Sequence, residues 1–469
     1  MEQVRKRLDP VKAELRVQVI HHDITDDNVV GRREISGSVL PYAVIDFGDM
    51  TKSWLIAELA TTCASLLHHG DGDPFSILPA VKAFHAVYLL EKEELIALWP
   101  LIVARACVLL AASHQQLRLD PSNDYAAANA AHERIIFETA TSVPFELMEK
   151  AIFLALDIDL EAKHHANRKS IVPSVDLNSA TQVDLSIDYS AFVAGNWNSS
   201  NIKQQILFDA ARKTGCSLTR YGEYRLTRTR VNSRTEPESF ALHIAVCVPA
   251  GTKIVAPFDG SADFADGSLI LRDGESNLHL NGLDIRDGLA HSVSSGDVLG
   301  VARNDQGGLG IIYVQQSEIV SDALPQFAKP SQAAVWSELC PSPAGFLCLS
   351  IDASSMQPAS LLEKRYKSLA GTQKHYYENP PQIERGWKEH LFDTEGRAYL
   401  DMVNNVTTIG HGHPRLAENV HRQWLKLNTN SRFHYSEVAV FRKDLRLWRR
   451  MGLILYFWSI AALRQMIWH

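Results

Sequence analysis

Three side chains near the start of the sequence have the types and spacing that phosphate chemistry needs. Asp23 and Asn28 lie five residues apart in the stretch HHDITDDN, and Asp46 follows the apolar run YAVI. A carboxylate can orient or deprotonate an acceptor hydroxyl, and further oxygen ligands can hold Mg²⁺ against phosphates. We therefore expect Asp23 to act as the base and Asn28 and Asp46 to bind magnesium. The neighbouring His21 is expected to brace the backbone of the loop.

The residues after this loop must position it, and their pattern is helical. Apolar residues recur at every third and fourth position in WLIAELATTCASLL and EKEELIALWPLIVARACVLLAAS, which is typical of amphipathic helices. We predict a first domain over residues 1–165. A polar stretch rich in Asn and Ser then predicts a linker at 166–200.

The order of loop, strand and helix resembles the C-terminal lobe of the aminoglycoside phosphotransferase family, in the branch with homoserine and hydroxylysine kinases. The resemblance rests on HxDxxxxN at 21–28 and on VIDFGD at 44–49. It implies ATP as phosphate donor, a small amino compound as acceptor, and Asp23, Asn28 and Asp46 as the catalytic and metal positions. The family has a nucleotide-binding lobe before this loop. We therefore expect activity to need another polypeptide that supplies that lobe.

A second pattern begins near residue 240, where short apolar runs alternate with Gly and Asp. It predicts a small all-β domain over 201–325. The run HIAVCVPAGTKIVAPFDG resembles the lysostaphin-like zinc metallopeptidases, which implies ligand or catalytic positions at His243 and His279. Cys247 stands where that family has an Asp, and LGIIYVQQ replaces its closing H-x-H. Since a catalytic zinc needs three protein ligands, we expect no zinc and interpret the domain as a spacer or binding module.

The third part follows a predicted linker at 326–354 and covers residues 355–440. Its motifs DTEGRAYLD and GHGHP resemble the beginning of class-III pyridoxal-phosphate aminotransferases, in the branch with phospholyases acting on phosphorylated amino alcohols. The resemblance implies a dimer for the intact parent enzyme, and places the residues that hold pyridoxal phosphate later in the family's sequence. The positions implied at the edge of the substrate pocket are Asn404, Asn405, Gly410 and His411. We also predict a strand pair around DTEG and a helix in PRLAENVHRQWLKLN.

Residues 441–469 depart from this pattern. Their apolar stretch MGLILYFWSIAAL is shorter than a bilayer-spanning helix requires. Reading the codons one frame over allows the string VNSGSEANDLA, which resembles the next motif of the aminotransferase family. We therefore interpret 441–469 as a frameshifted tail and the chain as a fragment of a longer fusion.

Composition narrows the class of protein. A formal net charge of −7 with scattered basic residues argues against a nucleic-acid partner, and no signal peptide or membrane span is expected. Six separated cysteines without a CxxC pair indicate buried thiols and a cytoplasmic location. The predicted fold is multidomain α+β: a mainly helical kinase-like lobe, an all-β domain, and a truncated α/β aminotransferase start. We expect this chain to be inactive alone, with a non-catalytic binding module through the β domain as the alternative.

Overall fold

The computed structural model describes residues 1–35, 37–158, 169–265, 267–319, 324–349, 377, 380–403 and 409–426. The chain divides into two compact units. One contains Met1–Arg385 and Leu391–Leu400, and the other contains Gly386–His390 and Asp401–His469. Helices and sheets are both present, as the multidomain α+β prediction requires.

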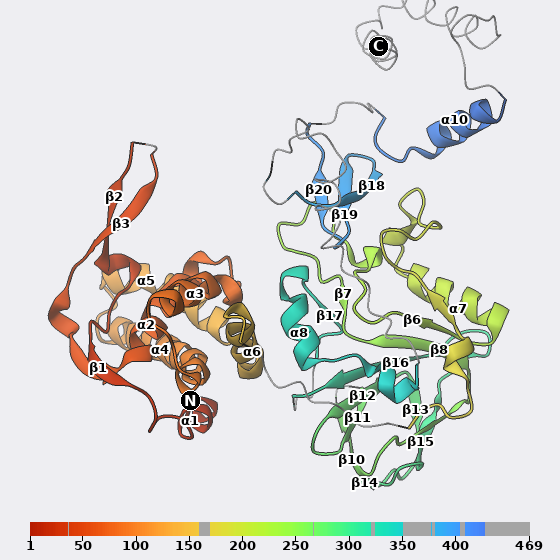
Figure 1. Cartoon of the computed structure of the whole chain (residues 1–469), viewed down its shortest axis with the longest axis horizontal. Coiled ribbons are helices and arrows are strands. Elements are labelled where there is room, and N and C mark those ends of the chain that lie inside the picture. The colour runs from red at the N-terminus through yellow and green to blue at the C-terminus, as the bar shows by residue number, and fades with distance from the viewer. Residues whose placement is uncertain are drawn as a thin grey trace, which may run out of the picture. The chain divides into compact units, whose positions relative to one another are not determined.

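Residues 1–158 begin with a short helix, continue through short strands and end as a group of helices (Figure 1). The helices are α1 Glu2–Leu8, α2 Leu55–Leu66, α3 Leu78–Val87, α4 Lys92–Leu119, α5 Asp124–Ala140 and α6 Phe145–Ala155. The 3-10 segments are η1 Asp26–Asn28, η2 Phe47–Asp49, η3 Leu67–His69 and η4 Pro74–Ile77. The strands are β1 Val17–Ile20, β2 Val29–Arg33, β3 Val39–Val44 and β4 Thr51–Trp54. Antiparallel pairs join β1 to β4 and β2 to β3.

Helix α4 is the centre of the helical part. It begins at a capping box in which Glu91 and Glu94 exchange side-chain hydrogen bonds with backbone N–H groups, satisfying donors that the first helical turn leaves free. Apolar residues at helical spacing, such as Leu98, Trp99 and Ile102, are buried in one core with residues of α2, α5 and α6. The helical periodicity of the sequence is confirmed in this region.

By length and composition α4 is also apolar enough to cross a membrane. In the most apolar window of this helix, 44% is buried inside the protein. The core helix of a soluble protein satisfies the same criterion, so α4 is weak grounds for a membrane location.

The second part is built on an eight-stranded sheet in the order β14-β10-β11-β12-β16-β8-β6-β5. All its pairs are antiparallel except β5 with β6. Its strands are β5 Thr181–Val183, β6 Ser217–Thr219, β8 Ile244–Pro249, β10 Gly260–Ala265, β11 Ser268–Arg272, β12 Asn277–Asn281, β14 Ser292–Val293 and β16 Leu309–Ser317. Smaller sheets use β7 Phe240–Ala241 with β17 Phe327–Ala328, and β13 Leu283–Ile285, β15 Val298–Ala302 and β9 Lys253–Val255. The predicted change to strand structure is confirmed.

Alternation along β8, β12 and β16 separates two faces of this sheet. Val246, Leu278 and Ile312 point into the largest apolar cluster of the β part. The opposite face lies against helix α7 (Ile202–Thr214), whose Leu207 and Phe208 are buried. The prediction of an all-β domain is therefore wrong in one respect, because a helix lies within 201–325.

Parts of both predicted linkers are ordered structure. Residues 169–200 supply β5, η5 Leu177–Ser179 and η6 Asn196–Asn198, with Phe192 and Trp197 buried. Residues 326–349 supply β17, η8 Pro330–Gln332, η9 Pro343–Leu347 and α8 Ala333–Leu339, whose Trp336 packs with Phe240 and Leu242. Both stretches are polar in overall composition, so the sequence predicted linkers. Their few apolar residues are nevertheless buried, because they pack against residues far away in the chain.

The third part contains β18 Ile383–Trp387, β19 His390–Asp393 and β20 Ala398–Leu400 in one sheet, followed by α10 Pro414–Lys426. The predicted strand pair around DTEG and the predicted helix are confirmed. Asn404, Asn405 and the predicted frameshifted tail lie outside the described residues.

Candidate functional site

The hairpin β2–β3 brings two of the predicted metal positions together. Val29 lies opposite Val44 in its register, so the residues just outside the hairpin, Asn28 and Ile45, lie side by side at its open end. The Ile45 N–H donates to the Asn28 carbonyl over 3.0 Å. Asp46 is the next residue, and therefore the segment of Asp46 is held beside the segment of Asn28.

Asp23 is held in this arrangement by two donors. The Asn28 amide nitrogen donates to Asp23 Oδ2 over 2.9 Å, and Arg105 of α4 donates from Nη2 to Asp23 Oδ1 over 2.9 Å. Since the amide nitrogen of Asn28 faces Asp23, its amide oxygen is the atom that remains for a cation. Carboxylate and amide oxygens are the ligands that Mg²⁺ prefers, so the donor set fits this metal.

His21 and Asp46 lie around the same backbone. The buried His21 ring is 2.9 Å from the Ile45 carbonyl through Nε2, and its edge packs on Phe47 with ring centroids 4.9 Å apart. Asp46 has φ +61°, a left-handed conformation rare for a residue with a side chain, and its exposed carboxylate accepts from Gly48 N over 3.4 Å. Such conformations cluster at functional sites. The site thus combines an anchored Asp23 with an exposed Asp46 carboxylate, whose segment is joined to that of Asn28.

The residues predicted from the zinc peptidase resemblance lie on one face of the eight-stranded sheet. Cys247 is paired with Ile311 and His279 with Gln315 across β16, and residues two apart on a strand point the same way. His243 immediately precedes β8, four residues before Cys247. The sheet therefore turns the three side chains toward the α7 side.

The side chain of Arg225 contacts the ring nitrogen of His243 that a metal ion would otherwise bind. The Arg225 guanidinium, fully buried, donates from Nη1 to His243 Nε2 over 3.2 Å, and His243 Nδ1 donates to the Gln326 carbonyl over 3.0 Å. Burial lowers the pKa of His243 well below its usual value, and the positive charges of Arg225 and Lys203 add to this effect. Both ring nitrogens are engaged, so His243 does not fit a zinc ligand.

Cys247 also does not fit a metal ligand. It is a fully buried free thiol, and burial raises its pKa to about 12. The thiolate is the form that binds zinc, and burial opposes its formation at this position. His279 lies buried in β12. The donor set of this face does not fit zinc.

Lys203 of helix α7 packs against the same face of the sheet. From its lowered pKa we predict that the stability of the protein depends on pH. Its ammonium packs 4.6 Å from the centroid of the Tyr313 ring, and burial, followed by the charges of Arg225 and Arg228, lowers its pKa from 10.5 to about 7. Between those pH values the unfolded chain binds a proton that the folded chain lacks, so the free energy of unfolding rises with pH.

We expect the free energy of unfolding of the unmodified chain, relative to Lys203→Met, to rise by up to about 1.4 kcal/mol per pH unit between pH 7 and 10.5. Urea denaturation of both proteins at several pH values across this window measures the difference, in which the titrations of other groups cancel. A difference that stays constant with pH would contradict the lowered pKa of Lys203.

Gly410 and His411, predicted at a substrate pocket, lie beside Lys388 in the second unit. Lys388 and His411 exchange backbone hydrogen bonds of 3.0 and 2.7 Å, and His411 Nε2 is 2.8 Å from Asp401 Oδ2. Gly410 has φ +85°, and a Cβ there would lie 2.8 Å from Lys388 Cα. Gly410 of the GHGHP motif therefore permits this close backbone approach.

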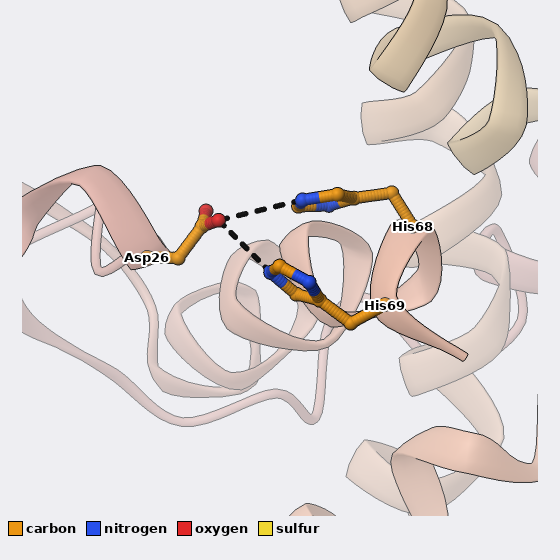
Figure 2. Close-up of side chains that lie close together, drawn as sticks. All are labelled: Asp26, His68 and His69. Carbon is orange, nitrogen blue, oxygen red and sulfur yellow. Dashed lines mark hydrogen bonds and ion pairs between the residues drawn. The ribbon is translucent and has the colours of Figure 1, made fainter. Parts of the chain in front are cut away.

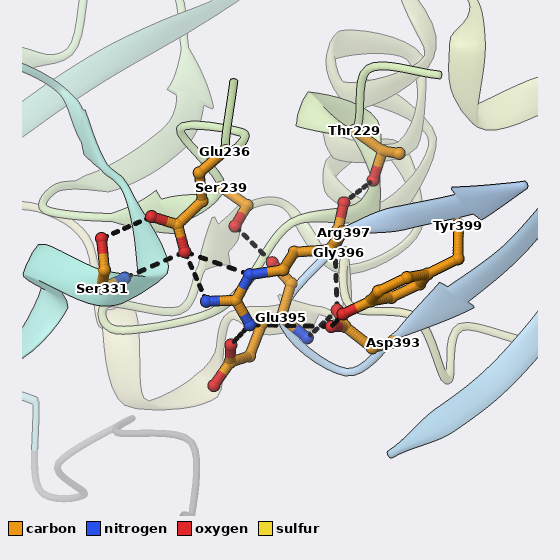
Figure 3. Close-up of polar contacts among 9 residues, drawn as sticks. All are labelled: Thr229, Glu236, Ser239, Ser331, Asp393, Glu395, Gly396, Arg397 and Tyr399. Atoms are coloured by element: carbon orange, nitrogen blue, oxygen red, sulfur yellow. Dashed lines mark hydrogen bonds and ion pairs between the residues drawn. The ribbon is translucent and has the colours of Figure 1, made fainter. Parts of the chain in front are cut away.

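The DTEGR turn between β19 and β20 is fixed by a polar network in the first unit (Figure 3). Asp393 accepts from the backbone of Glu395 and Arg397 at 3.0 and 2.8 Å and from the Tyr399 hydroxyl at 2.8 Å. Arg397 forms ion pairs with Glu395 and Glu236. The turn also contacts the β part through Thr229, which donates to the Gly396 carbonyl, and through Ser239, which donates to the Glu395 carbonyl. Ser331 in turn donates to Glu236, the partner of Arg397.

Comparison with known proteins finds similarity in a short segment. No family model matches the chain. It is 39% identical over 70 residues to an alanine–glyoxylate aminotransferase 2-like protein of Drosophila melanogaster, covering 15% of this chain and 14% of the relative. It is 32% identical over 72 residues to ethanolamine-phosphate phospho-lyase homolog 1 of Caenorhabditis elegans, covering 15% of each, and 41% identical over 58 residues to acetylornithine aminotransferase of Nostoc, covering 12% and 14%.

About 70 residues of this chain are similar to class-III aminotransferases. These matches span only about one seventh of each relative's length. Among solved structures, the solution structure of lysostaphin is similar at 15% identity with a TM-score of 0.19, over 35% of this chain and 61% of that chain.

The sequence did not reveal that Glu223 and Arg225 are buried together. Nothing in the string TRYGEYRLT distinguishes the buried Glu223 and Arg225 from ordinary surface charges. The doublet His68–His69 after an apolar helix was a visible signal, because imidazole is the commonest metal ligand among side chains.

Proposed function

We propose that residues 1–158 carry a site for phosphoryl transfer from Mg·ATP to a hydroxyl group of a small amino compound. The observation that carries the proposal is the hydrogen bond of 3.0 Å between Ile45 N and the Asn28 carbonyl. It ties the segment of Asp46 to the segment of Asn28, next to the Asp23 carboxylate. This is the arrangement that a base and two oxygen ligands for magnesium require.

In this proposal each residue has a distinct role. Asp23 orients the acceptor hydroxyl and takes its proton, while Arg105, at 2.9 Å, holds the carboxylate in place. The oxygens of Asn28 and Asp46 hold magnesium, which would neutralise charge on the phosphates when bound. We propose that a further polypeptide segment supplies the lobe that binds the adenine nucleotide.

We further propose that the aminotransferase-like similarity belongs to residues 355–440 and that the parent protein joins both activities. One relative is named as an ethanolamine-phosphate phospho-lyase homolog, and ethanolamine phosphate is a phosphorylated amino alcohol. A kinase acting on an amino compound would produce that class of substrate. Pyridoxal phosphate belongs to this second activity, and no described residue of the chain is assigned to hold it.

The test of the phosphoryl-transfer site is ligand-induced stabilisation. We expect Mg·ATP to raise the melting temperature of the unmodified chain, since a ligand at a hundredfold excess over its Kd adds about 2.7 kcal/mol to the free energy of unfolding. Asp46→Ala should abolish the shift, and so should removal of magnesium with a chelator. Differential scanning fluorimetry measures both.

The matched control is Asp49→Ala, three residues further in η2 and also exposed. It should keep the shift. Absence of any shift in the unmodified chain rejects the proposed site, and an equal shift in Asp46→Ala rejects the assigned role of Asp46.

A further inference from the structure

A second group of ligand-type side chains lies close to Asp23 but uses none of the residues assigned to magnesium. Asp26 opens η1, and His68 and His69 lie in η3 at the end of α2. Their carboxylate oxygen and ring nitrogens all lie within 4.8 Å of one another (Figure 2). The geometry points to a binding site for a divalent first-row transition metal, with zinc as the reference ion.

The separations between the ligand atoms agree with a zinc site. Asp26 Oδ2 is 3.0 Å from His69 Nε2 and 3.4 Å from His68 Nε2. Zinc binds His nitrogens and carboxylate oxygens at about 2.0–2.2 Å, so two ligands at a tetrahedral angle are roughly 3.3 Å apart. A metal ion can therefore be coordinated with small movements of these side chains.

Hydrogen bonds to Ser65 orient two of the ligands. The Ser65 carbonyl accepts from His68 Nδ1 over 2.6 Å, which leaves the Nε2 lone pair of the neutral ring directed toward Asp26. The Ser65 hydroxyl donates to Asp26 Oδ1 over 2.6 Å, so Oδ2 is the oxygen that faces both histidines. A backbone carbonyl behind a ligating histidine is the usual partner that fixes its tautomer.

Further contacts restrain the site from the side of α5. The His68 ring stacks on His132 with centroids 4.9 Å apart and planes at 22°, so the orientation of the imidazole is fixed before a metal binds. Asp26, His68, His69 and Glu133 line a cavity of about 440 Å³. The buried Oε2 of Glu133 has no hydrogen-bond partner within the part of the chain that the structure describes, and this carboxylate lines the same cavity outside the three-residue cluster.

The ligand types select the class of metal. Two imidazole nitrogens and one carboxylate suit zinc, nickel, cobalt and copper, whereas magnesium and calcium prefer oxygen ligands alone. The cavity of this cluster also contains Asp23, so a metal ion bound there lies in the same cavity as the proposed base. The inference is independent of the proposed phosphoryl transfer, because neither Asn28 nor Asp46 takes part.

The experiment measures zinc binding by the full chain. The protein is stripped with a chelator, and zinc is titrated in competition with a chromophoric chelator while inductively coupled plasma mass spectrometry counts bound metal. We expect one tight site per chain, and at least about tenfold weaker zinc binding in His68→Gln and in Asp26→Asn. Circular dichroism checks that each variant is folded.

Matched controls locate the site. His114→Gln changes an exposed histidine of α4 and should bind zinc as the unmodified chain does. Asp46→Ala should also bind zinc normally while losing the Mg·ATP response, which separates failure of this inference from failure of the proposed function. If Asp26→Asn does not fold, His69→Gln, at a half-exposed histidine, takes its place. Equal zinc affinity in His68→Gln and the unmodified chain, or no tight site in the unmodified chain, overturns the inference.

Discussion

Glu223→Leu is expected to destabilise the β part by about 3–5 kcal/mol. Glu223 and Arg225 are both almost completely buried, with Glu223 Oε2 at 3.5 Å from Arg225 Nε. Burial raises the pKa of Glu223 to about 7 and lowers the pKa of Arg225, so desolvation opposes the charged form of each partner. Leucine at 223 leaves the guanidinium without a countercharge and removes the acceptor of the Leu185 N–H.

The double variant Glu223→Leu with Arg225→Met provides the control. Replacing a complete buried ion pair by apolar residues is often neutral or stabilising, so the double variant should recover much of the loss. Hydrogen exchange of peptides covering β8 and β16, measured at pH 8 where the Glu223 carboxyl is largely ionised, reports the free energy of opening. A single variant within about 1 kcal/mol of the unmodified chain would mean that water reaches the pair and contradicts its burial.

Trp99→Ala is expected to cost the helical part about 3–5 kcal/mol, the usual range when a buried tryptophan becomes alanine. Trp99 is 1% exposed at the centre of α4 and packs in the core shared with α2, α5 and α6. Alanine leaves a cavity that these helices cannot fill without moving. The variant Trp424→Ala, at a side chain 70% exposed on α10, removes the same group without opening a cavity and should change the stability little.

Hydrogen exchange of peptides from α2 and α4 measures this effect in the region concerned. The Trp99→Ala variant should exchange faster there, while peptides from β8 and β16 keep their protection. Equal protection of α2 and α4 in both tryptophan variants would show that Trp99 does not stabilise the helical core.

Local features of the fold could be predicted from the sequence because they depend on neighbouring residues. Apolar spacing of three and four predicts α2 and α4, since a helix places those positions on one face. The string HLFDTEGRAYL predicts two strands around a turn, and Asp393 does accept hydrogen bonds from the backbone of that turn. The pairing of Asn28 with Ile45 likewise follows from a hairpin only sixteen residues long, Val29–Val44.

Other features depend on residues far apart in the chain, and composition misrepresents them. The stretch that contains Trp197 is polar and predicts a linker, yet this tryptophan packs edge to face on Phe392. By residue type Arg225 would be expected at the surface. In the fold it is buried and donates hydrogen bonds to Thr219 of β6 and to His243, which immediately precedes β8. No local pattern encodes these contacts, because hydrophobic and polar preferences describe a residue's own type and not its partner.

The sequence by itself determined helices α2 and α4, the strand runs of the β part and the residue types of the loop around Asp23, because each of these follows from periodicity or spacing over a few residues. Tertiary structure alone decided which charges meet. It placed Arg225 against His243, at the position to which the peptidase resemblance assigns a metal ligand, and it joined Asp26 to two histidines that lie more than forty residues away. The physical reason is that burial and charge at a site are properties of packed elements, and packing brings together residues that the chain keeps apart.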